Sequence, residues 1–189
     1  MARQRGAEQG GAPFRNALAR RAAARSPARR RAWAPRFFAI DQSPTMLELL
    51  GKRAEREGLS VQTRVMDGHA LALNDDGFDI AGSQFGVMLF PDMPRGIREM
   101  ARVVKPGGRV LVIAYGNPHQ IDFLGFLVEA VRSVRPDFDR PPVDPPPLPF
   151  QLSDPERLRR ELAAAGLHEI SVETIIESTD FKMGEELWD

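Results

Sequence analysis

The stretch REMARVVKPGGRVLVIAYG, residues 98–116, decides the fold class of this chain. From the residue just before this stretch through its first half, apolar residues recur at helical spacing and predict an amphipathic helix: Ile97, Met100, Ala101 and Val104. Lys105–Gly108 predicts a turn, and Arg109–Tyr115 contains four successive β-prone residues, a pattern typical of a strand covered on both faces. A helix followed at once by a buried strand favours an α/β fold with a parallel sheet.

Three more strands are predicted upstream of this unit: Phe37–Ile40, Val61–Val65 and Phe78–Phe85. Between the first two, Ser43 and Pro44 have the residue types of an N-cap and a first helical position, and Gly58 is a helix stop. Strands separated by helices imply right-handed crossovers, which carry the ends of the strands to one edge of the sheet. Polar residues follow or end these strands, namely Asp41, Asp67 and Gln84, and that edge is where ligands bind in open α/β sheets.

Downstream of residue 116 the rhythm of strands and helices breaks. The apolar stretch Ile121–Val134 could be helical, but Arg140–Pro149 contains six prolines and cannot be regular helix or central strand. We therefore predict that residues 116–150 form a lid or an insertion on the substrate side. Ser153 to Glu156 has the spacing of a capping box and predicts a further helix, and Leu167–Ile176 predicts a further strand.

The first 36 residues differ in composition from the rest. They hold ten arginines and one acid, so residues 37–189 carry a net charge of −9 although the whole chain is neutral. We predict that residues 1–36 are a disordered basic leader and that residues 37–189 are the folded domain. The leader has three interpretations: a transit peptide, a basic arm for nucleic acid or acidic surfaces, or out-of-register sequence standing where a strand and a glycine loop belong.

Several classes of protein are disfavoured by composition. The chain has no cysteine, and its three histidines lack metal-ligand spacing, so we expect no disulfide and no metal. No stretch approaches the length of about 20 apolar residues that a membrane span needs. The expectation is a soluble cytoplasmic protein without a nucleic-acid partner.

Three segments in order resemble the class I S-adenosylmethionine-dependent methyltransferases that act on small molecules, the quinone-biosynthesis type in particular. The segments are AIDQSPTMLELLGKRAE (39–55), VMDGHALALNDDGFDIAGSQFGVMLFPD (65–92) and the opening stretch (98–116). The resemblance covers about residues 37–178. It implies a Rossmann-like, mostly parallel sheet with helices on both faces, incomplete in this chain at both ends, and S-adenosylmethionine as cofactor.

The resemblance also implies roles for particular residues. Asp41 would accept hydrogen bonds from the ribose hydroxyls, with Gln42 beside it, or it could simply cap the next helix. Asp67 would meet the adenine amino group, with Gly68 and His69 lining the pocket, although Asp-Gly also makes plain turns.

The same resemblance places the end of the third strand, Gln84 and Phe85, near the sulfonium and its methyl group, although Phe85 could equally be a core residue. No residue is predicted as a catalyst. Tyr115 and His119 follow the strongest strand, and each could accept a proton or be structural.

One family feature is missing from the sequence. The glycine-rich loop after the first family strand should lie roughly 20 residues before Asp41, yet no glycine occurs between Gly11 and Gly51. The predicted activity is methyl transfer from S-adenosylmethionine to a small-molecule acceptor. Two alternatives remain open: an inactive truncated fragment, and a nicotinamide-binding Rossmann domain.

Overall fold

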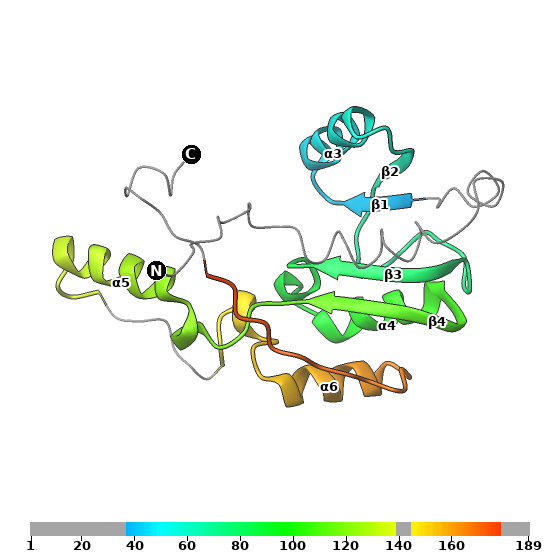
Figure 1. Cartoon of the computed structure of the whole chain (residues 1–189). Coiled ribbons are helices and arrows are strands. Elements are labelled where there is room, and N and C mark those ends of the chain that lie inside the picture. The colour runs from blue at the N-terminus through cyan, green and yellow to red at the C-terminus, as the bar shows by residue number, and fades with distance from the viewer. Residues whose placement is uncertain (1–36, 139–144, 179–189) are drawn as a thin grey trace, which may run out of the picture. The chain divides into compact units, whose positions relative to one another are not determined.

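The computed structural model describes residues 37–138 and 145–178, and Phe38–Thr174 form one compact unit (Figure 1). Strands and helices alternate in the order β1 (Phe37–Asp41), α3 (Pro44–Arg56), β2 (Val61–Val65), β3 (Phe78–Gln84), η1 (Val87–Leu89), α4 (Met93–Val103), β4 (Val104–Ile113), η2 (Pro118–Gln120), α5 (Asp122–Val134), η3 (Leu148–Phe150) and α6 (Pro155–Ala164), where η marks a 3-10 helix. The alternation predicted for an α/β fold is confirmed. The leader at residues 1–36 and the prolines at 141 and 142 lie outside the described residues.

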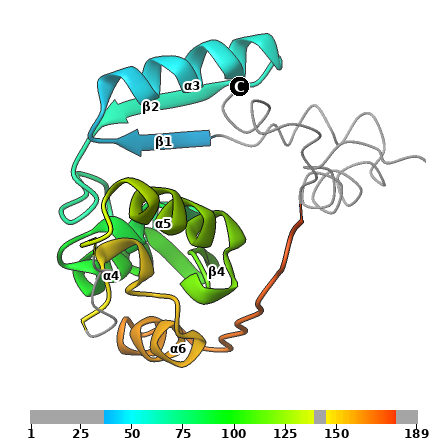
Figure 2. The same cartoon turned by 90° about the vertical axis from the view of Figure 1, so that its left-hand side faces the viewer.

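The four strands form two pairs. β1 pairs with β2, and β3 pairs in parallel with β4; β1 and β2 point the same way in Figure 2. Contacts near both ends of the strands connect the two pairs. The rings of Phe38 and Phe78, near the amino ends of β1 and β3, lie 6.0 Å apart. Beyond the carboxyl ends, the ring of Phe90 lies directly against Gly68.

Helix α3 begins where the sequence predicts it. Ser43 is the N-cap, its hydroxyl accepts the N–H of Met46 at 3.3 Å, and Pro44 is the first helical residue. The chain leaves the helix through Gly58, whose φ of 68° is costly for any residue with a side chain. Leu47 and Ala54 make the buried face.

The Lys-Pro-Gly-Gly segment is a bulge inside β4 and not a turn that precedes it. Phe78 pairs with Val104 and Ile80 with Arg109, so four residues of β4 lie opposite Asp79 alone. The Lys105 ammonium lies 2.8 Å from the Asp79 carboxylate. Gly108 is required there, because a Cβ would come within 2.4 Å of Val104 and 2.8 Å of the Asp79 carbonyl oxygen. The sequence predicts a turn at Lys105–Gly108 because proline and glycine are found both in turns and in such bulges.

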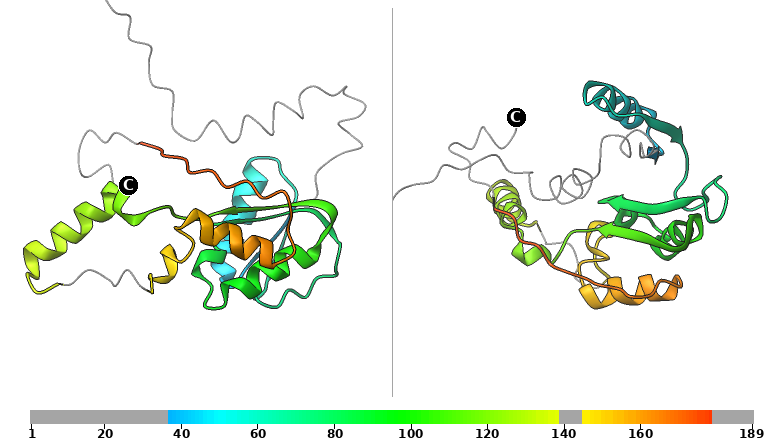
Figure 3. Two further views of the ribbon diagram at one scale, coloured as in Figure 1. Left: turned by 90° about the horizontal axis from the view of Figure 1, so that it is seen from below. Right: turned by 45° about the vertical axis from the view of Figure 1, so that its right-hand side comes forward.

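The core lies on one side of the β3–β4 pair, where α4 and α6 pack together (Figures 1 and 3). Its buried residues come from η1, α4, α6 and the segment before α6: Val87, Met88, Met93, Ile97, Leu152 and Leu162. Val112 of β4 packs against this core, whereas its neighbour Leu111 is 51% exposed on the opposite face, where Ile80 is 58% exposed. This alternation follows the two-residue period of a strand.

Two expectations for the C-terminal part are wrong in detail. The predicted strand Leu167–Ile176 has no regular structure, because no strand within the described residues pairs with it, and Ile175 and Ile176 are exposed. The helix cap is Asp154 and not Ser153: its carboxylate accepts the Glu156 N–H at 3.0 Å. The helix suspected within Ile121–Val134 is present as α5.

Candidate functional site

Asp41 is the last residue of β1 and its side chain is exposed. One carboxylate oxygen, Oδ1, accepts the backbone N–H of Ser43 at 2.7 Å. This bond tightens the turn into α3, as the capping interpretation of Asp41 expects. It uses only one of the two oxygens, so the same carboxylate can fix the turn and still accept a bond from a ligand.

Asp67 follows β2 and lies beside the end of β1. The N–H of Met66 donates to the carbonyl oxygen of Asp41 at 3.1 Å, and the side-chain amide of Gln42 donates to Asp67 Oδ1 at 3.2 Å. The backbone N–H and ring Nδ1 of His69 reach the same oxygen at 2.9 Å and 2.7 Å. Among the described residues all three donors use Oδ1, which leaves Oδ2 for a ligand.

The hydrogen bonds from His69 also set the charge of this group. The backbone N–H of His69, followed by its ring, holds the pKa of the Asp67 carboxyl below its ordinary value. Asp67 is therefore ionised at neutral pH and acts only as an acceptor. A fixed acceptor beside a strand end suits an amino or hydroxyl donor of a ligand.

Phe90 is part of this site, although no sequence pattern singled it out. Its ring lies between Gly68 and Gly96, where an added Cβ would come within 2.4 Å and 2.5 Å of ring carbons. The His69 ring lies 4.5 Å from it, tilted by 32°. Gly68 is thus more than a turn residue, since its missing side chain admits an aromatic wall. In the sequence, Gly68, Phe90 and Gly96 are merely two glycines and a phenylalanine. Their relation becomes visible only when the fold brings them together.

Helix α4 holds the loop that follows Asp67. Glu99 accepts the N–H of Leu71 at 2.7 Å, and Arg102 donates to the carbonyl oxygens of Leu71 and Leu73 at 2.9 Å and 2.8 Å. Arg102 also pairs with Glu99 and Asp75, which lowers the pKa of Glu99 and raises that of the guanidinium. Glu99 and Arg102 therefore both stay charged, and their hydrogen bonds hold the loop after Asp67 against α4.

Gln84 and Phe85 form a second group at the end of β3. Gln84 pairs with Ile113 and is exposed. Phe85 has a φ of 54°, which ends the strand one residue earlier than predicted, and its ring stacks on Tyr115 with centroids 4.9 Å apart. Phe85 is 38% exposed, so it is not a core residue. No hydrogen bond or ring contact joins this group to Asp41 or Asp67 within the described ranges.

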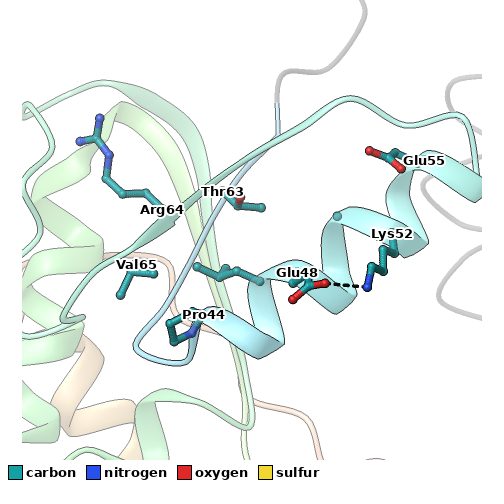
Figure 4. Close-up of a pocket in the computed structure, with 9 residues that line it drawn as sticks. Pro44, Glu48, Lys52, Glu55, Thr63, Arg64 and Val65 are labelled. Atoms are coloured by element: carbon teal, nitrogen blue, oxygen red, sulfur yellow. Dashed lines mark ion pairs between the residues drawn. The ribbon is translucent and has the colours of Figure 1, made fainter.

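The remaining features do not add to these groups. An open depression of about 540 Å³ lies between α3 and β2, where Figure 4 shows the ion pair of Glu48 and Lys52, 2.6 Å apart, but it includes neither Asp41 nor Asp67. His119 lies in η2, where its N–H donates to Asn117. In the described part of the chain, no cluster of metal-ligating residues occurs, and no helix there is long and apolar enough to cross a bilayer.

Comparison with known proteins finds similar sequences and structures. The model of a family described as a methyltransferase domain matches residues 21–112. An uncharacterised protein of Mycobacterium tuberculosis is 35% identical over 107 residues, 56% of this chain and 38% of that protein. The demethylmenaquinone methyltransferase of Thermus thermophilus is 36% identical over 78 residues, 41% of this chain and 36% of that enzyme.

A solved S-adenosylmethionine-dependent methyltransferase from Methanosarcina mazei shares 26% identity, with a TM-score of 0.41 over 46% of this chain and 45% of its own. The chain thus spans less than half the length of each of these relatives. The fold of this chain is Rossmann-like in its alternating strands and helices and in its parallel β3–β4 pair. The matched segments are similar to those of the class I methyltransferases, a family whose cofactor is S-adenosylmethionine.

Proposed function

We propose that this chain binds S-adenosylmethionine at the carboxyl ends of β1 and β2 and transfers its methyl group to a small-molecule acceptor. The observation that supports this proposal is the convergence of Asp41, Gln42 and Asp67, joined by the bonds from Met66 to Asp41 and from Gln42 to Asp67. Two carboxyl side chains beside neighbouring strand ends match the donors of a nucleoside, which are ribose hydroxyls and a base amino group.

Each residue has a role in this proposal that fits its surroundings in the structure. The free oxygen of Asp41 accepts from the ribose, and Oδ2 of Asp67 accepts from the adenine amino group. Gly68 and His69 line the base, with Phe90 behind them as an apolar wall. Residues 12–36 contain no glycine, so the proposal rests on the nucleoside end of the cofactor and assigns no loop to its methionine end.

The reaction needs little acid–base chemistry from the protein. The cofactor, when bound, would supply a methyl group on a positively charged sulfur; a nucleophile of the acceptor would take this methyl group as the carbon–sulfur bond breaks, with S-adenosylhomocysteine as the leaving group. The part of the protein is to hold the two reactants in line and exclude water, which accounts for most of such an acceleration. We assign Gln84 and Phe85 to the methyl side of the site and assign no catalytic residue.

Calorimetric titration of the full chain with S-adenosylhomocysteine tests the proposal. Asp41→Asn keeps an oxygen for the Ser43 N–H but removes the charge, so it should weaken binding about tenfold or more. Glu129→Gln on the exposed side of α5 is the matched control and should bind as the parent does. Absence of binding by the parent chain would support the inactive fragment, and preferential binding of NAD would support a nicotinamide site.

A further inference from the structure

Helix α4 contacts both the loop after Asp67 and the ring of Phe90, which belong to the proposed nucleoside site. Near the start of the helix, Gly96 lies so close to Phe90 that an added Cβ would come within 2.5 Å of a ring carbon. Near its end, Glu99 and Arg102 bond the loop. In the described part of the chain, neither of these two side chains has a hydrogen bond or ion pair with Asp67 itself. Any effect that they have on the site therefore passes through the loop.

The start of the loop is fixed where the turn after Asp67 closes. In that turn, the N–H of Ala70 donates to the carbonyl oxygen of Asp67 at 3.1 Å. The next residue, Leu71, is held by both of its backbone groups. Its N–H donates to Glu99 at 2.7 Å, and its carbonyl oxygen accepts from Arg102 at 2.9 Å. The short turn that carries the nucleoside site is thus tied to α4 directly after its own closing bond.

The far end of the loop is fixed to the same part of the helix. Arg102 donates to the carbonyl oxygen of Leu73 at 2.8 Å, and its own carbonyl oxygen accepts the N–H of Asp76 at 3.1 Å. The carbonyl oxygen of Val103 accepts the N–H of Gly77 at 2.9 Å. Asp76 has a φ of 54°, an uncommon conformation for a residue with a side chain, and these bonds hold it there. The path of the loop between β2 and β3 is therefore set by α4.

The residue types suit this task. A guanidinium carries five N–H donors in one plane, so Arg102 can bond two carbonyl oxygens and a carboxylate at once. Oε2 of Glu99 accepts from Leu71 and from Arg102, both at 2.7 Å, and Oε1 accepts from Arg102 at 2.8 Å. The pair is partly buried, so salt screens it less than it would an exposed pair. We call Glu99 and Arg102 the α4 clamp.

We propose that the α4 clamp preforms the nucleoside site: it holds the loop that carries Asp67 and His69 in place beside Phe90 before a ligand binds. The inference rests on the proposed function, because it concerns the same site. A ligand that enters a preformed site does not have to order a loop, and its affinity is higher for that reason. Glu99 and Arg102 are positioning residues in this assignment, since they act through the loop and do not touch the ligand.

Calorimetric titration of the full chain with S-adenosylhomocysteine measures the effect of the clamp on affinity. Arg102→Ala should weaken binding about tenfold or more, because the loop must then be ordered on binding. Arg102→Lys keeps the charge but not the planar set of donors, so it should not restore the affinity. Glu99→Gln keeps an oxygen for the Leu71 N–H and should bind more tightly than Glu99→Ala.

Arg159→Ala is the matched control. Arg159 lies on α6 and also donates to a backbone carbonyl oxygen, that of Ile170 at 2.6 Å, but this bond is not part of the nucleoside site. Its loss should leave the affinity for S-adenosylhomocysteine unchanged. Circular dichroism establishes that each variant is folded at the temperature of the titration, which separates a change in affinity from a loss of the fold.

His69 reports on the loop without any ligand. The chain has three histidines, so ¹H–¹³C NMR of the histidine-labelled protein gives few signals, and His69→Gln assigns the one from His69. The His69 ring bonds Asp67 and lies 4.5 Å from the ring of Phe90, so its signal depends on where the loop lies. The signal should shift in Arg102→Ala and stay in place in Arg159→Ala.

Equal losses of affinity in Arg102→Ala and Arg159→Ala, or an unmoved His69 signal in Arg102→Ala, would overturn the role of the clamp. Binding of S-adenosylhomocysteine that Arg102→Ala leaves unchanged would reject the clamp and leave the proposed function standing. A His69 signal that moves in Arg102→Ala, in a parent chain that binds no S-adenosylhomocysteine, would reject the cofactor site and retain the clamp as the support of the Asp67 loop.

Discussion

The side-chain amide of Gln42 donates a hydrogen bond to the Asp67 carboxylate at 3.2 Å, across 25 residues of sequence. Gln42 is the first residue after β1, and Asp67 is the second after β2. The bond therefore shows that the ends of β1 and β2, which are separated in the sequence by helix α3, lie side by side. The nucleoside site proposed here depends on that convergence.

The first prediction concerns acid. Because the pKa of Asp67 in the folded chain lies below its ordinary value of 3.8, the ionised carboxylate stabilises the fold at pH values above that point. This contribution is lost as the pH falls through the lowered pKa. The difference in unfolding free energy between the parent and Asp67→Asn should therefore shrink below about pH 4, as measured by urea denaturation between pH 6 and pH 2. A difference that stays constant over this range would contradict the role of the charge.

The second prediction tests the fit of Phe90 against Gly68. In Gly68→Ala the new methyl group would lie 2.4 Å from a ring carbon of Phe90, so the variant should lose about 1–3 kcal/mol of stability. Gly51→Ala is the control: it lies within α3, nothing approaches its added Cβ within 4 Å, and it should gain up to about 1 kcal/mol. Adding Phe90→Leu to Gly68→Ala should recover part of the loss. Equal stability of the two alanine variants in chemical denaturation would refute the close contact.

The third prediction isolates the strain at Phe85. Phe85→Ala and Phe85→Gly both remove the ring, but only glycine adopts a φ of 54° without cost. Phe85→Gly should therefore be more stable than Phe85→Ala by about 1 kcal/mol. Tyr115, whose backbone is not in the positive-φ region, should show the opposite order, with alanine above glycine. Thermal unfolding of the four variants provides the comparison, and the same order at both positions would argue against strain.

The fourth prediction concerns Gln151. Gln151→Leu keeps the volume close to that of glutamine but leaves the Met88 and Phe90 carbonyl oxygens without this donor, so the variant should lose about 1–3 kcal/mol of stability. Gln120→Leu, at an exposed position in η2, should change stability by less than about 0.5 kcal/mol. Because Gln151 links η3 to η1 and Phe150 of η3 contacts Tyr115, the loss of Gln151 should also change the ¹⁹F NMR signal of Tyr115, the single tyrosine of the chain, when it is replaced by 3-fluorotyrosine. An unchanged signal together with unchanged stability would show that the link is dispensable.

Much of the fold is predictable from local patterns. The cap at Ser43, the stop at Gly58 and the polar residues that end β1, β2 and β3 are all where the sequence indicates. Such features depend on neighbours in the chain. The missed features depend on distant ones: the strand expected at Leu167–Ile176 has no partner strand in the part of the chain that the structure describes, and the bulge at Lys105–Gly108 arises only because β4 pairs with β3.

The sequence by itself determined the class of fold, the resemblance to methyltransferases and the candidate acids Asp41 and Asp67, because residue types and their spacing are enough to define strands, turns and motifs. Only the tertiary structure decided that Phe90 fits between two glycines, that Phe85 is strained and that Tyr115 lies between two other rings. The physical reason is that side-chain packing joins residues far apart in the chain. Local propensity carries no information about which distant surfaces will meet.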